Sequence, residues 1–219
     1  MSEANKLRRG DATVDNLVCT VWKKIAPPKV EFMLWLALLG KLNTWDLLAK
    51  KGILTEQDNL CPFCAVQLET TDHILLQCQT SWSIWGKMAD DLGIQIDRQM
   101  NFRQFYAEWM AKGYHNPIRK KLYIAAFFAA AWSLWTLRNN LVFEGQNLDL
   151  NVLYHKIRWR TALWSKAWKE NPPYSTDTLV RNFTSFPQLF PKKTLRFIPD
   201  AAFMTLSEIG WMYVAFNCF

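Results

Sequence analysis

Four residues between positions 61 and 78 have the types and spacing of metal ligands: Cys61, Cys64, His73 and Cys78, in the pattern Cys-x2-Cys-x8-His-x4-Cys. Thiolate sulfur and imidazole nitrogen are ligands that zinc prefers, and three cysteines with one histidine complete its tetrahedral shell without a position for substrate. The two-residue spacing of the first pair is that of a tight turn, which Pro62 stiffens. The pattern predicts one structural Zn²⁺ ion and no catalytic metal.

The chain around these residues must bring them together. Residues 68–78 favour a turn that runs into a short helix, with Thr71 or Asp72 as its N-cap and an apolar surface at residues 74–76. His73 would then lie in the first helical turn and Cys78 at the last. A Cys-x2-Cys pair alone would also fit a redox motif or a chance pair, and the added histidine and third cysteine favour zinc.

The remaining sequence predicts a mainly α fold. Apolar periodicity, with proline or polar residues at the starts and glycine at the ends, predicts helices over residues 30–39, 45–51, 81–92, 101–112, 119–143 and 152–169. Leu122 to Leu137 carries no charge, but sixteen residues are fewer than the roughly 20 that cross a bilayer, so we expect a buried core helix. We expect most of the twelve tryptophans to lie in the core.

The formal net charge of +7 lies, in effect, within residues 101–171, where eleven Lys and Arg residues stand against four acids. Residues 61–100, which include the candidate zinc ligands, carry a net charge of −3. A cluster of positive charge indicates a phosphate-binding face, although an ordinary solvated helix surface has the same pattern. On the amphipathic helix predicted at 152–169, the candidate nucleic-acid contacts are Arg158, Lys166 and Lys169.

Several strings of residues carry a family resemblance. They are the block from Val21 to Val30 with Pro27-Pro28-Lys29, the Cys61-Pro-Phe-Cys64 string, the stretch from Glu69 to Cys78, and Ile84-Trp85. Together they resemble the zinc-binding domain of plant non-LTR (LINE-type) reverse transcriptases over about residues 20–86. A shorter segment, Trp135-Thr-Leu-Arg138-Asn139 with Phe143-Glu-Gly145, is similar to one that often follows this domain.

The resemblance implies a part of a retroelement polyprotein downstream of the polymerase, which helps to hold template RNA or target DNA. The resemblance, the charge pattern and the proline content together predict four segments: an N-terminal extension at 1–19, a reverse-transcriptase-type zinc-binding domain at 20–93, a basic helical region at 100–171 and an irregular, proline-containing tail at 172–219. Nucleic acid is the expected partner, the polymerase of the same element is the alternative partner, and we expect neither a membrane nor a small-molecule substrate.

An enzymatic role is not expected. The string Met88-Ala-Asp-Asp91 is similar to the metal-binding turn of a polymerase, but Met stands in place of the aromatic residue and the surroundings predict a helix. Two other function classes stay open: a protein-interaction module that docks on a polymerase, and a truncated retroelement remnant without current function. The polar N-terminus has no signal-peptide core, so we expect an intracellular protein, not a secreted one, with the nucleus favoured over the cytoplasm.

Overall fold

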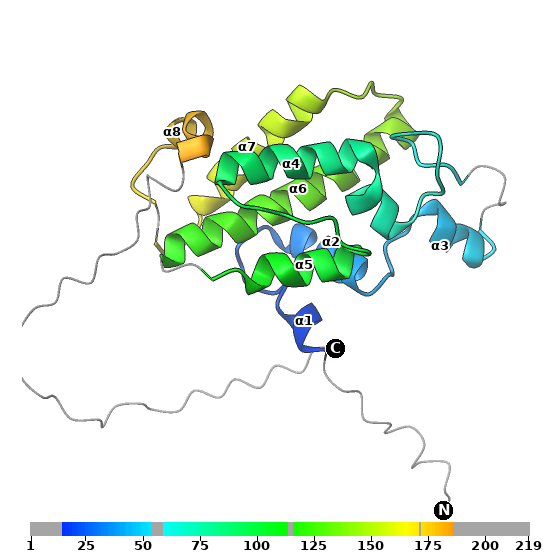
Figure 1. Ribbon diagram of the computed structural model, residues 1–219, viewed down its shortest axis with the longest axis horizontal. Helices are drawn as coiled ribbons and strands as arrows, with labels where there is room; N and C mark the ends of the chain where they lie inside the picture. Colours follow the sequence, from blue (N-terminus) through cyan, green and yellow to red (C-terminus); the bar gives the residue numbers. More distant parts are fainter. Residues whose placement is uncertain (1–14, 54–58, 114–115, 171, 186–219) are drawn as a thin grey trace, which may run out of the picture.

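The computed structural model describes residues 15–53, 59–113, 116–170 and 172–185, and this part of the chain is mainly helical, as predicted (Figure 1). In chain order its elements are α1 (Asn16–Cys19), α2 (Pro28–Leu38), α3 (Trp45–Lys50), the π-helix η3 (His73–Gln77), α4 (Gln79–Leu92), α5 (Phe102–Ala111), α6 (Pro117–Glu144), α7 (Leu150–Ser165), α8 (Thr176–Arg181) and the 3-10 helix η4 (Phe183–Ser185). The described residues contain no strand, only an isolated antiparallel bridge between Leu60 and Leu68.

The long helix α6 is the centre of the fold. The Asn116 side chain caps its start by accepting from the backbone N–H groups of Ile118 and Arg119, and Gly145 ends it in the left-handed region at φ 60°. Helices α2, α4, α5 and α7 all pack against α6, and α4 lies alongside it in Figure 1. Its apolar stretch is buried in the core, as predicted, and no described helix is long and apolar enough to cross a membrane.

An aromatic cluster around Phe127 joins α4, α5 and α6. The ring of Phe127 lies 4.8 Å from that of Trp85 and 5.3 Å from that of Trp109, measured between centroids. Phe102, Phe105 and Tyr106 complete the cluster, so the predicted aromatic stripe of residues 101–112 is buried as one face of α5. Because these rings come from both sides of residue 94, the predicted segments 20–93 and 100–171 share one hydrophobic core.

The structure differs from the sequence prediction near the end of α7. The helix stops at Ser165 instead of continuing to residue 169, and the next backbone bonds, from Ala167 to Trp164 and from Trp168 to Ser165, span three residues. This tighter turn carries the Trp168 indole inward, where its Nε1–H donates to the carbonyl of Ile25 at 2.9 Å. The helix therefore ends earlier than its apolar periodicity predicts, where Trp168 turns inward to the Ile25 carbonyl, an acceptor far away in the sequence.

Most of the described tryptophans lie in the core or pack against it, as expected. Of the eleven tryptophans among the described residues, Trp85, Trp109 and Trp168 are buried, Trp22 and Trp159 are exposed, and the other six are partly buried. Residues 172–185, which were predicted as part of an irregular tail, include the helix α8, and Phe183 after it is buried in the core. The rest of that predicted tail, 186–219, and the N-terminal residues 1–14 lie outside the described residues.

Candidate metal centre

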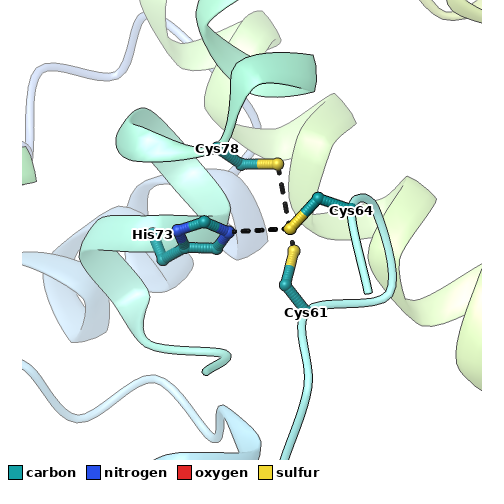
Figure 2. Close-up of side chains that lie close together, drawn as sticks. All are labelled: Cys61, Cys64, His73 and Cys78. Atoms are coloured by element: carbon teal, nitrogen blue, oxygen red, sulfur yellow. Dashed lines mark hydrogen bonds between the residues drawn. The ribbon is translucent and has the colours of Figure 1, made fainter. Parts of the chain in front are cut away.

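A tight reversal of the chain presents Cys61 and Cys64. The backbone N–H of Cys61 donates to the carbonyl of Gln67 at 2.7 Å, and that of Glu69 donates to the carbonyl of Asn59 at 2.7 Å. Within the loop that the first of these bonds closes, the chain turns through Ala65, which has a positive φ of 52°. The turn leaves the Cys61 and Cys64 side chains on one side, facing η3 (Figure 2).

The other two side chains lie at the ends of η3: His73 is its first residue and Cys78 follows its last. Thr70, and not Thr71 or Asp72 as predicted, caps this helical segment: its hydroxyl accepts from the backbone N–H of His73 at 3.0 Å. The Asp72 carboxylate accepts instead from the backbone N–H of Phe102, at the start of α5. The wide turn closes with a bond from the Cys78 N–H to the His73 carbonyl, so both predicted ligands lie at the two ends of one π-turn.

The four side chains meet at distances that suit zinc. Their ligand atoms all lie within 4.8 Å of one another. Cys61 Sγ is 3.9 Å from Cys78 Sγ, and Cys64 Sγ is 3.4 Å from His73 Nε2 (Figure 2). A tetrahedral ion with Zn–S of about 2.3 Å and Zn–N of about 2.0 Å would separate two sulfurs by about 3.8 Å and sulfur from nitrogen by about 3.5 Å. The donor set and its spacing therefore fit one Zn²⁺ ion.

A largely buried set of three cysteines and one histidine is typical of a structural zinc site. Cys61, His73 and Cys78 are buried and Cys64 is partly buried. Cys61 Sγ donates a hydrogen bond to Cys78 Sγ, and this bond lowers the pKa of Cys78 and raises the pKa of Cys61. Cys78 therefore loses its proton first, and Cys61 keeps its proton to stabilise the thiolate. Four protein ligands leave a zinc ion no position for water or substrate, so the ion would supply cross-linking of the chain and no reaction.

A buried ion pair ties the metal segment to α3 and α6. Glu69, fully buried, accepts from Arg138 through both carboxylate oxygens, at 2.7 and 2.9 Å. The same carboxylate accepts from the backbone N–H of Trp45 at 2.9 Å and so caps α3, because the N-cap residue Thr44 makes no side-chain capping bond. Sequence reasoning missed this role for Glu69 and Arg138, although both lie in the strings that carry the family resemblance.

Two side chains of α4 complete the surroundings of η3. Ser81 Oγ donates to the carbonyl of Ile74 at 2.6 Å, and Trp85 Nε1 donates to the carbonyl of Leu75 at 2.7 Å. The widened π-turn does not use these carbonyls within the helix, so α4 supplies their partners. The sequence showed only that Trp85 belongs to the resemblance and gave no reason for it.

The candidate nucleic-acid contacts do not lie together on one helix face. Arg158 lies on α7 and forms an ion pair with Asp91 of α4, where Tyr154 also donates to the same carboxylate. Lys166 lies just past α7 and donates to the carbonyl of Pro172 at 2.9 Å, and Lys169 is exposed beyond the helix. Asp91 belongs to the Met88–Asp91 string, which lies within the helix α4, as the sequence predicted.

Comparison with known proteins agrees with this centre. Residues 1–85 match the family model described as zinc-binding in reverse transcriptase. The match includes all four side chains of the cluster, Glu69 and Trp85, and it begins at residue 1, ahead of the predicted start at residue 20. The comparisons with curated proteins and with solved structures found no significant match. The N-terminal part of the chain is therefore similar to a reverse transcriptase zinc-binding domain.

Proposed function

We propose that the chain is a non-catalytic module in which one structural zinc ion holds the fold and a basic surface binds nucleic acid. The observation that carries this proposal is the convergence of Cys61, Cys64, His73 and Cys78 within the segment that matches the reverse transcriptase family. We propose further that the module belongs to a plant LINE-type (non-LTR) retroelement and holds template RNA or target DNA during reverse transcription. This role would require the protein to act in the nucleus.

The nucleic-acid surface is separate from the metal centre. The zinc segment meets α6 at Arg138, through Glu69, whereas the lysines at the start of α6 are Lys120 and Lys121. Seventeen residues separate Lys121 from Arg138, which corresponds to about 26 Å along a helix that rises 1.5 Å per residue. The ion would therefore stabilise the module and not contact the phosphates.

Basic residues from three segments meet around Trp168. The indole of Trp168 donates to the carbonyl of Ile25, next to Lys23 and Lys24, and Lys121 Nζ lies 6.0 Å from the centre of a Trp168 ring. We call this surface the Trp168 corner and define it by Lys23, Lys24, Lys120, Lys121, Lys166 and Lys169. Glu170 neutralises Lys121 at 2.6 Å, while Lys23, Lys24, Lys120 and Lys169 are exposed.

The folded structure redistributes the charge seen in the sequence. Arg138 and Arg158, both in the basic segment, pair with Glu69 and Asp91 from the acidic segment. Arg103 forms an exposed pair with Asp15, which lies outside the acidic segment. These pairs neutralise the arginines, so the exposed lysines of the Trp168 corner are the better candidates for phosphate contact, and Arg158 serves the packing of α7 on α4.

A salt titration tests the proposal. The zinc-loaded protein is titrated against labelled RNA and duplex DNA, and phosphate binding predicts a linear fall of log affinity with log salt concentration. The variant Lys120→Gln/Lys169→Gln should reduce the slope by up to about 1.8 for duplex DNA, since each lost phosphate contact contributes about 0.9. The variant Lys41→Gln/Lys51→Gln removes the same charge from exposed residues outside the corner and should leave the slope unchanged.

The same measurement can contradict the proposal. A salt-independent response, or no binding at low salt, would remove nucleic acid as the partner and favour docking on a polymerase. Equal losses in the corner variant and the control variant would mean that net charge, and not the Trp168 corner, drives binding.

A further inference from the structure

Three aromatic side chains form a cluster on the surface beside the Trp168 corner. Phe32 and Trp35 of α2 are stacked, with ring centroids 5.7 Å apart and an angle of 22° between their planes, and Trp22 lies 6.5 Å from Trp35. Trp22 is 44% exposed and Phe32 is 49% exposed, while Trp35 is partly buried and packs on the core. Large aromatic side chains normally bury their surface, so this cluster presents ring area that can receive a ligand.

Three lysines lie close to the aromatic cluster in the sequence, and the one acid of residues 21–45 is buried. Lys23 and Lys24 follow Trp22 directly, and Lys29 lies at the start of α2 with its Nζ 5.5 Å from the centre of the Trp132 ring of α6. All three lysines are exposed. Between residues 21 and 45 the chain has one acid, Glu31, and it is buried.

Glu31 holds the lysine-bearing loop in place. Its carboxylate accepts from the backbone N–H of Ile25 at 3.1 Å, and it lies against the backbone N–H groups of the neighbouring loop residues. Burial raises the pKa of this carboxyl group, and the backbone donors act in the opposite direction. The single negative group of the region thus faces inward, and Lys24, with a positive φ of 54°, holds the loop in a sharp bend above it.

We propose that Trp22, Phe32 and Trp35 form a stacking platform for the unpaired bases of single-stranded nucleic acid, and that Lys23, Lys24 and Lys29 contact its phosphates. The inference rests on the proposed function and adds a site and a ligand class to it. Exposed aromatic rings within a basic surface are the combination that binds single strands, because every unpaired base offers a face for stacking. Paired bases keep their faces inside the duplex, so the platform selects single strands.

The decisive experiment removes the rings and the bases separately. Zinc-loaded wild-type protein and the variant Trp22→Ala/Phe32→Ala are titrated with an oligonucleotide of about 12 nucleotides and with a base-free sugar-phosphate backbone of the same length. Stacking predicts that the wild type binds the complete oligonucleotide about tenfold or more tightly than the base-free backbone, and that the variant loses this preference. The variant Trp22→Phe keeps a ring and should retain most of it.

Controls separate stacking from other effects of the substitutions. The variant Trp159→Ala/Leu163→Ala removes an equally exposed pair from α7, 41% and 49% exposed, and should bind like the wild type. Zinc content and the thermal midpoint of each variant show that the fold is kept. The variant Lys23→Gln/Lys24→Gln should reduce the salt slope by up to about 1.4 on single strands, whereas the aromatic variant should leave the slope unchanged.

Each outcome decides between the two proposals. If the aromatic variant binds the complete oligonucleotide as tightly as the wild type, the stacking platform is refuted while nucleic-acid binding by the Trp168 corner stands; the aromatic cluster would then be a protein-docking surface. If the wild type binds no nucleic acid at any salt concentration, both proposals fail. Loss of the preference for bases in the aromatic variant, with the control pair unaffected, supports the platform.

Discussion

The Glu69 carboxylate joins three parts of the molecule that are far apart in sequence. It lies at the base of the metal segment, accepts the first N–H of α3, and meets the Arg138 guanidinium of α6 through both oxygens. The rings of Trp45 and Trp135 lie 5.7 and 5.2 Å from the guanidinium carbon, so the arginine is enclosed by aromatic faces. A buried charge in such surroundings is tolerated only while its partner is present.

We expect Arg138→Ala to destabilise the protein by about 3–5 kcal/mol, because it leaves the Glu69 carboxylate buried without a counter-charge. Denaturant unfolding of the zinc-loaded protein measures the change. The double variant Glu69→Gln/Arg138→Met should recover part of the loss, since it removes both charges and keeps apolar volume. Lys120→Ala, an exposed residue of the same helix, should change stability by less than about 0.5 kcal/mol. A loss below about 1 kcal/mol for Arg138→Ala would contradict the assigned role of the pair.

At the scale of elements, the π-turn η3 is the feature that depends most on its neighbours. Ile74, Leu75 and Leu76 are fully buried, and the carbonyls of the first two are satisfied by side chains of α4. Both carbonyls lie in the last turn of a helical segment, where backbone carbonyls have no partner within the helix. Helix α4 therefore stabilises the turn that carries His73 and Cys78.

Two serines of α4 allow this dependence to be measured. Ser81→Ala removes the donor to the buried Ile74 carbonyl and should lower the unfolding free energy by about 1–3 kcal/mol, with a fall in zinc affinity because η3 loosens. Ser83→Ala, two residues along the same helix, removes an exposed hydroxyl that bonds the Thr80 carbonyl and should have little effect. Equal zinc affinity and stability in the two variants would show that η3 holds its shape without the Ser81 hydroxyl.

How far the sequence predicted these elements depends on the range of the interactions involved. Helices whose signals are local, such as the proline start of α2 and the Asn116 and Gly145 ends of α6, lie within a few residues of their predictions. The four metal-cluster residues were also identified, because their spacing is a local pattern. The cap of α3 by Glu69 and the end of α7 at the Trp168 turn were missed, since each depends on a contact with a residue at least 24 positions away.

At the scale of the whole molecule, the metal segment and the long helices belong to one core. The core runs from Val18 to Phe183 among the described residues and includes Cys61 and Cys78. In Figure 1 the metal segment lies near one end of α6, beside α3, and the start of α6 lies at the other end. A change at the metal centre should therefore reach α4 and the C-terminal half of α6 before it reaches the Trp168 corner.

Removal of zinc should loosen the metal segment and its neighbours before it loosens the Trp168 corner. We expect about one zinc per chain by elemental analysis, and chelation should increase hydrogen exchange most strongly in residues 59–85, because structural zinc contributes folding free energy directly. Protection in α7 and at the start of α6 should persist longer. Acidification should act in the same direction as chelation, since the thiolates and the imidazole must be deprotonated to bind the ion and protons compete with it as the pH falls.

The cysteines provide a matched test of this expectation. Cys78→Ser should reproduce the exchange pattern of the chelated protein even with zinc present, whereas Cys19→Ser, which changes a cysteine of α1 outside the cluster, should keep both the zinc and the protection. An unchanged exchange pattern after complete removal of the ion would show that the hydrogen bonds of Glu69, Ser81 and Trp85 alone hold the segment. Exchange that rises equally in α7 and in residues 59–85 would instead mean that the core unfolds as one cooperative unit, with the zinc ion stabilising the Trp168 corner as strongly as its own surroundings.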